Sequence, residues 1–113
     1  MSHPPLDDDR TARFRDMVAE DPDNELAQFS LGQALLDAGR SEDAASAFEA
    51  AYLLQPDLMM AYFRRAECLM QAQRYEEAQE MAKKTLALAI AQDHKGPRAD
   101  AEEMLEEIDD ALA

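Results

Sequence analysis

The sequence repeats itself after 34 residues. Shifting the chain against itself by 34 positions aligns identical residues at eight places between residues 25–58 and residues 59–92, in one register and without a gap. The identical pairs are Ala27 and Ala61, Phe29 and Phe63, Leu35 and Leu69, Ala38 and Ala72, Arg40 and Arg74, Glu42 and Glu76, Ala44 and Ala78, and Leu54 and Leu88. A constant period of this length predicts that each copy forms one supersecondary unit and that the units stack to bury a shared core.

The same shift extends to the N-terminal side of the first copy. Phe48 then matches Phe14, and Pro56 matches Pro22. Residues 11–22 are therefore interpreted as the second half of an earlier, truncated copy.

The composition predicts an all-α protein. Residues that favour strands are scarce, because the β-branched set consists of Thr11, Val18, Thr85, Ile90 and Ile108. Strong helix formers such as Ala, Leu, Glu, Gln and Arg make up much of the rest. We expect no sheet.

Local signals place about six helices. In the first copy, Asn24 or Asp23 is a candidate N-cap for a helix over about residues 24–38, and Gly39 suits the left-handed residue that ends it. Ser41 is the candidate N-cap of the next helix. Residues 93–97 are expected to be a loop, because they contain Gly96 and Pro97, and a last helix is expected at about 98–111.

Residues 25–58 resemble a tetratricopeptide repeat. The family spacing is matched by a series of apolar and small residues and a closing proline, namely Leu31, Gly32, Leu35, Ala44, Phe48, Ala51 and Pro56. Residues 59–92 follow the pattern less fully, since Arg65 replaces a leucine, Ala82 an aromatic residue and Ile90 the closing proline. The missing proline predicts that the last helix of this copy runs past the usual end.

The resemblance implies an α-α superhelix of antiparallel helix hairpins. Residues 1–10 would form a disordered acidic tail and residues 11–113 a single domain. Within that domain, the half copy at 11–22 and the repeats at 25–58 and 59–92 would be followed by a capping helix at 97–113.

The resemblance also implies that the first helix of each repeat lines a concave, apolar, acid-rimmed groove. The expected groove residues are Leu26, Phe29, Gln33, Leu36, Asp37, Met60, Phe63, Arg64, Glu67, Met70 and Gln71. Some relatives grip a C-terminal carboxylate with a basic clamp in this groove. The corresponding positions here hold Phe29, Gln33 and Arg64, without a lysine, so no such clamp is expected.

The charge balance narrows the class of partner. The formal net charge is −14, with 11 Lys and Arg against 25 Asp and Glu. Nucleic acids and anionic membrane surfaces are disfavoured, because both are bound through clusters of basic residues. A protein or peptide partner with basic and apolar character is favoured by long-range attraction. The sequence shows neither a signal peptide nor a spanning segment, so a cytoplasmic location is expected.

Catalysis and metal binding find no support in the sequence. His3, His94 and Cys68 cannot be combined with a base and an orienting group into a catalytic set. The acidic run from Glu102 to Asp110 lacks the spacing of a calcium loop and is interpreted as a solvated helix face. We therefore expect neither an enzyme nor a bound cofactor.

Three functions remain open at this point. The first is an adaptor of bacterial type that binds a peptide or a partner helix in the groove. The second is a type III secretion chaperone, because residues 66–71 are similar to a segment found in the class that protects translocators. The third is a structural scaffold that assembles with itself, for example as a homodimer.

Overall fold

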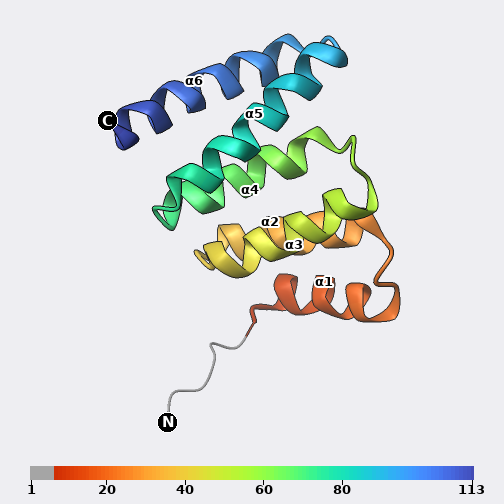
Figure 1. Ribbon diagram of the computed structural model, residues 1–113. Coiled ribbons are helices and arrows are strands. Elements are labelled where there is room, and N and C mark those ends of the chain that lie inside the picture. The colour runs from red at the N-terminus through yellow and green to blue at the C-terminus, as the bar shows by residue number, and fades with distance from the viewer. Residues whose placement is uncertain (1–6) are drawn as a thin grey trace.

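A computed structural model describes residues 7–113 of the chain, and every regular element among them is an α-helix. The six helices form a stack with α1 at one end, α6 at the other and the hairpins α2–α3 and α4–α5 between them (Figure 1). Their bounds are Asp9–Glu20 for α1, Glu25–Asp37 for α2, Ser41–Leu54 for α3, Met59–Gln71 for α4, Tyr75–Ala91 for α5 and Lys95–Leu112 for α6. The prediction of an all-α fold with about six helices is confirmed.

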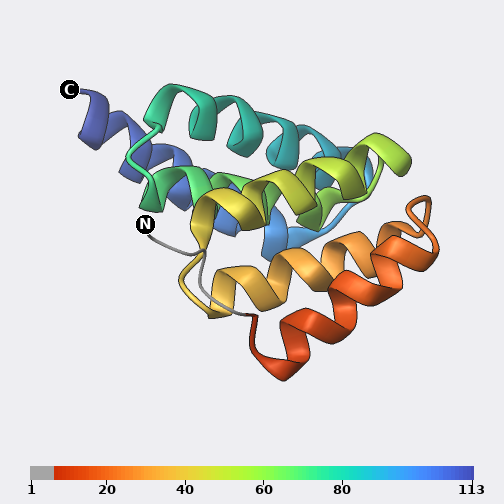
Figure 2. The same ribbon diagram turned by 90° about the horizontal axis from the view of Figure 1, so that it is seen from below.

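Each helix packs mainly against its neighbours along the chain, and α2 also touches α4. Viewed along the stack from the α1 end, successive hairpins do not eclipse one another but are turned and offset (Figure 2). This is the superhelical arrangement expected when repeats of one kind stack with a constant small rotation.

The turns within the repeats use left-handed residues at equivalent positions. Gly39 has a φ of 78° after α2, and Gln73, which is 34 residues further on, has a φ of 59° after α4. Asn24 caps α2 as expected, since its side chain accepts a hydrogen bond from the backbone N–H of Ala27 at 3.0 Å. The cap expected at Ser41 is wrong, because Arg40 holds the N-cap position of α3 and Ser41 is already helical.

Two expected boundaries are also wrong. The last helix begins at Lys95 instead of about residue 98, because Gly96 and Pro97 lie in its first turn, where a proline's missing N–H costs no hydrogen bond. At the other end, Asp9 and Arg10 belong to α1, so the tail expected over residues 1–10 ends earlier. Residues 1–6 of that tail lie outside the described part of the chain. The expected extension of the last helix of the second copy is confirmed, since α5 continues to Ala91.

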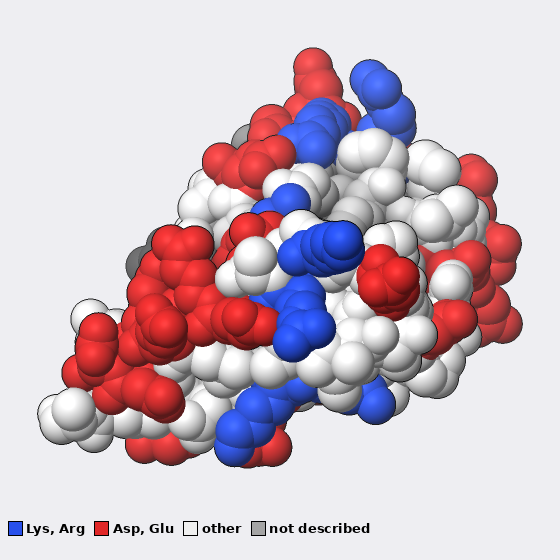
Figure 3. Space-filling view, turned by 90° about the horizontal axis from the view of Figure 1, so that it is seen from above, with Lys and Arg blue, Asp and Glu red and all other residues white. Residues whose placement is uncertain are grey.

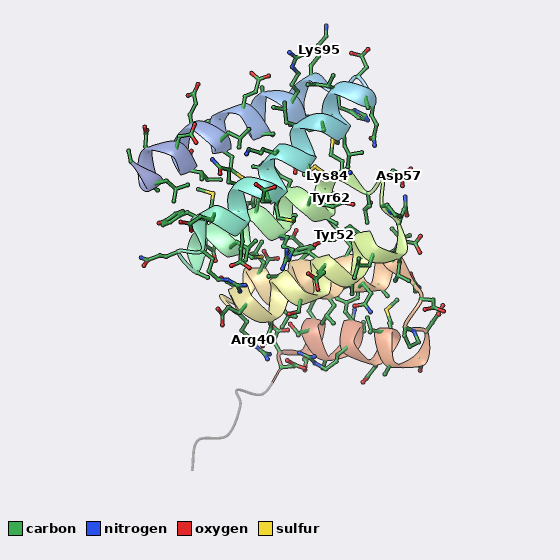
Figure 4. All side chains as sticks on the ribbon, viewed as in Figure 1. Arg40, Tyr52, Asp57, Tyr62, Lys84 and Lys95 are labelled. Carbon is green, nitrogen blue, oxygen red and sulfur yellow. The ribbon has the colours of Figure 1, made fainter. Side chains whose placement is uncertain are left out.

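Ion pairs hold the N-terminal helix to the first hairpin. Asp7 accepts hydrogen bonds from Arg15 of α1, at 2.6 Å, and from Arg40 at the start of α3, which is labelled in Figure 4. The bonds from Arg15 and Arg40 lower the pKa of Asp7 below its ordinary value. A second pair joins Arg10 to Asp37 at the end of α2, at 2.7 Å.

The first copy has an aromatic core. Phe48 of α3 is fully buried, and its ring meets the edge of Phe29 of α2 with 5.3 Å between the ring centroids. Gly32 makes room for it, because a Cβ at this position would lie 2.8 Å from the Phe48 ring. The same slots of the second copy hold Ala66 and Ala82, both fully buried.

Without an aromatic ring at residue 82, the core of the second copy is completed from outside the repeat. Met104 and Ile108 of α6 are buried in one cluster with Ala66, Leu69 and Ala82. The side chains of α6 are therefore part of the core of the second copy, as Cys68 of α4 is part of the core of the first.

Arg65 stands where the first copy has a buried leucine; its terminal nitrogens have polar partners, whereas its buried Nε has none among the described residues. Its guanidinium group lies 3.2 Å from a carboxylate oxygen of Glu49 and 3.3 Å from the hydroxyl oxygen of Tyr52. Tyr52 stacks on Tyr62 with 4.2 Å between ring centroids, and the Lys84 ammonium group lies 5.8 Å from the Tyr62 ring. Figure 4 shows these three residues bridging α3, α4 and α5.

Replacing Gly32 by alanine tests the close approach of α2 to Phe48. We expect Gly32→Ala to lower the free energy of unfolding by about 1–3 kcal/mol, because the added methyl group overlaps a ring that cannot move in a packed core. Chemical denaturation measures this loss. Gly96→Ala is the control, since its Cβ would meet nothing within 4 Å, and it should leave stability unchanged or raise it. Equal effects of the two substitutions would contradict the interpretation.

Candidate functional site

A groove of about 400 Å³ lies between α4 and α6. It is formed by one face of each helix, and its lining residues are Phe63, Glu67, Met70, Gln71, Asp100, Glu103, Met104 and Glu107. A volume of this size is within the range of pockets that bury a small organic ligand or a few side chains.

The floor of the groove is apolar and deformable. Phe63 and Met70 of α4 are half-buried and pack against the core cluster of the second copy, to which Met104 of α6 belongs. Methionine side chains adapt to partners of different shape, because they are unbranched and polarizable. Phe63 is the counterpart of Phe29, but position 82 holds alanine, so no ring equivalent to Phe48 contacts it.

The rim of the groove is acidic. Asp100, Glu103 and Glu107 are exposed on α6 at helical spacing, so they share the face that borders the groove. Glu67 stands opposite them on α4. Figure 3 shows acidic side chains gathered over the end of the molecule that holds the C-terminal half of α6. Among the described residues that line the groove, none is a lysine or an arginine.

One cation lies beside the groove. Arg64 of α4 donates to both carboxylate oxygens of Glu67, at 2.9 and 3.1 Å. Its guanidinium carbon lies 5.9 Å from the centroid of the Phe63 ring, which is within the range of a cation–π contact. Both side chains of this ion pair are half-buried, with 33% of Arg64 and 29% of Glu67 exposed.

The structure brings together four of the residues predicted for the second copy. Phe63, Glu67, Met70 and Gln71 line the groove, and Arg64 reaches its edge. Met60, one turn earlier on α4, is half-buried and is not among the lining residues.

The residues predicted for the first copy lie outside this groove. Leu26 is 64% exposed near the start of α2. Phe29 and Leu36 pack against the core cluster of the first copy, which contains Phe48. Gln33 donates to Asp37 at 3.1 Å, and Asp37 is also paired with Arg10 of α1. Both Arg10 and Gln33 lower the pKa of Asp37 below its ordinary value.

Sequence reasoning missed the wall contributed by α6. Asp100, Glu103, Met104 and Glu107 recur at intervals of three and four residues, which is the spacing of one helix face. The sequence alone favours a solvated face for the acidic run, and its neighbourhood with α4 cannot be derived from the two repeats, which span residues 25–58 and 59–92.

The titratable side chains of the described residues bear on metal binding and on the reactivity of the cysteine. No group of three His, Cys, Asp or Glu side chains among them is placed to hold a metal ion. Burial of Cys68 raises the pKa of its thiol to about 12, so the thiolate is scarce at neutral pH. Within residues 7–113, no helix has the length and apolar character needed to cross a bilayer.

Solved structures with the same fold include a type III secretion translocator chaperone and two proteins in complex with segments of other proteins. PcrH in complex with the chaperone-binding region of PopD has a TM-score of 0.86 at 24% identity, covering 91% of this chain and 78% of that one. The translocator chaperone SycD of Yersinia enterocolitica has a TM-score of 0.84 at 20% identity, covering 88% of this chain and 69% of that one. The first repeat domain of Spaghetti (RPAP3), bound to the HSP90 peptide SRMEEVD, has a TM-score of 0.79 at 22% identity, covering 90% and 76%.

No curated protein matches the sequence as a relative. The family model described as tetratricopeptide repeat matches residues 10–58 and again residues 29–95. These matches span most of the helices, and they include both copies of the 34-residue repeat. The chain therefore belongs to the tetratricopeptide repeat family.

Proposed function

We propose that this chain is a protein-interaction module that binds a segment of another protein in the groove between α4 and α6. The observation that carries the proposal is an apolar floor of Phe63, Met70 and Met104 beneath a rim of carboxylates. Burial of a partner's apolar side chains against this floor makes binding more favourable. The similar structures that contain bound peptides support a role in protein binding.

The charge of the rim selects the chemistry of the partner. Four carboxylates border the groove, and no cation among the described residues lines it. A lysine or arginine of the partner would be attracted to this rim, whereas an acidic side chain would be repelled. The favoured partner segment therefore carries apolar anchors flanked by basic residues.

The size of the groove limits how much of the partner it contacts. Asp100 and Glu107 are seven residues apart on α6, which corresponds to about 10 Å along a helix axis. That length matches about two turns of a partner helix, or about three residues of an extended segment. A contact of this size favours moderate affinity.

Peptides of opposite charge test the proposal. We expect a labelled amphipathic peptide with leucines flanked by arginines to bind at least about tenfold more tightly than its counterpart with glutamates in place of the arginines. The acidic peptide SRMEEVD, which is bound by a structurally similar domain, should not bind measurably to this chain. Fluorescence anisotropy measures the affinity of the chain for each of the three peptides. Raising the salt concentration should weaken the binding of the basic peptide. Equal affinities for the basic and acidic peptides would refute the proposal.

A narrower candidate is a chaperone for a secreted translocator. One of the similar structures is described as a translocator chaperone, and another contains the chaperone-binding region of PopD. If this chain has that role, co-expression with a translocator of a type III secretion system should keep the translocator in solution and yield a complex on gel filtration. A translocator that precipitates equally with and without this chain would exclude the role.

A further inference from the structure

Arg64 occupies a position that a cation of the partner would need. Its guanidinium group contacts Glu67, the carboxylate that α4 contributes to the groove, through two hydrogen bonds. The same group lies 5.9 Å from the ring of Phe63, which forms part of the apolar floor. One aromatic ring and one carboxylate are the elements that hold a guanidinium group in many protein sites. Their use by Arg64 shows that this pair can accommodate one.

The ion pair also lowers the attraction of the groove for a partner. While Arg64 neutralises Glu67, the unpaired carboxylates of the groove are those of α6, namely Asp100, Glu103 and Glu107. None of these three is joined to a basic side chain within 4 Å among the ion pairs of residues 7–113. A partner cation that approaches α4 must displace Arg64 before it can use Glu67.

Arg64 has a second acidic group within reach of its charge. The pKa of Asp37 on α2 is lowered chiefly by the hydrogen bond from Arg10, and the positive charge of Arg64 also contributes. Asp37 keeps its own partner, Arg10, at 2.7 Å. The α2 side therefore offers the displaced guanidinium group a negatively charged neighbour.

We propose that Arg64 is an internal competitor, which holds Glu67 in the free protein and must be displaced when a basic segment binds. The proposal rests on the proposed function, and it adds that this one residue weakens the binding of basic partners. If Arg64 instead bound an acidic partner directly, its removal would weaken binding. The present proposal expects that its removal strengthens the binding of a basic partner.

A double-mutant cycle with the arginine- and leucine-bearing peptide tests the proposal. We expect Arg64→Gln to tighten binding by about threefold to tenfold, because Glu67 becomes free to pair with the peptide. In a Glu67→Gln background, the same substitution should change the affinity by less than about twofold, because the competed group is absent. The gain should shrink at high salt.

Arg98→Gln is the matched control. Arg98 pairs with Glu102 on α6 at 2.9 Å, and neither residue lines the groove. The substitution removes the same charge, so a gain that reflects only net charge would appear in both variants. The proposal expects the gain for Arg64→Gln alone, with the melting temperature of each variant close to that of the parent.

Two outcomes would overturn the proposal, and they differ from failure of the proposed function. Weaker binding by Arg64→Gln would mean that Arg64 contacts the partner directly, and an equal gain from both arginine variants would mean that only net charge matters. Failure of the proposed function is seen in the unsubstituted protein, as equal affinity for basic and acidic peptides. If neither the parent nor Arg64→Gln binds the basic peptide, both proposals are wrong.

Discussion

Phe48→Ala should lower the free energy of unfolding by about 3–5 kcal/mol, the largest stability loss that we expect from a single substitution in this chain. Phe48 is fully buried, and it fills the space that Gly32 leaves open on α2. Its removal also takes away the edge-to-face contact with Phe29. The cavity cannot close easily, because the surrounding alanines are already small.

The melting temperature should fall by more than about 10 °C, as measured by circular dichroism. Phe63→Ala is the matched comparison, since Phe63 holds the position of Phe29 but lines the groove and is half-buried. It should cost less than half as much stability, because part of its surface is already in water. If Phe48→Ala and Phe63→Ala lowered the free energy of unfolding by similar amounts, this would contradict the assignment of Phe48 to the core and of Phe63 to the groove.

Reversing two charges on α6 should abolish most of the binding of a basic peptide. We expect the double substitution Glu103→Lys with Glu107→Lys to lower the affinity for the arginine- and leucine-bearing peptide by at least about tenfold, because two attractive contacts become repulsive. Both side chains border the groove opposite Glu67. Isothermal titration calorimetry at two salt concentrations measures the change.

The control for this variant lies on the same helix. Glu102→Lys with Glu106→Lys changes the net charge by the same amount, but both residues are exposed and neither lines the groove. This control should lower the affinity for the peptide by less than about threefold, because only the long-range electrostatic field is altered. If both double variants lose affinity equally, the peptide is attracted by overall charge and the groove is not its site.

The sequence alone predicts the two repeats and the residues that α4 contributes to the groove. The 34-residue period defines α2 to α5, and the matched positions Phe29 and Phe63 identify the helix face from which a groove is built. It could not show that these two phenylalanines differ in role. That difference depends on the side chain packed behind each of them, a phenylalanine at 48 and an alanine at 82.

The other wall could not be predicted because α6 lies outside the two repeats. Its start was also misplaced, since Gly96 and Pro97 are typical of a loop and yet are compatible with the first turn of a helix. Its alternation of Met104 with acidic residues has the same pattern whether the acids face water or a groove. Only the packing of α6 onto α5 decides which of them border α4.

The position of α6 links partner binding to the order of the C-terminal end. In a linear array of helices, each unit is stabilised mainly by its immediate neighbours. Here α6 packs mainly against α5, and beside the groove it meets α4 through Met104 and Ile108. A segment bound across the groove would contact α4 and α6 together, so we expect hydrogen exchange in α6 to slow as the groove fills.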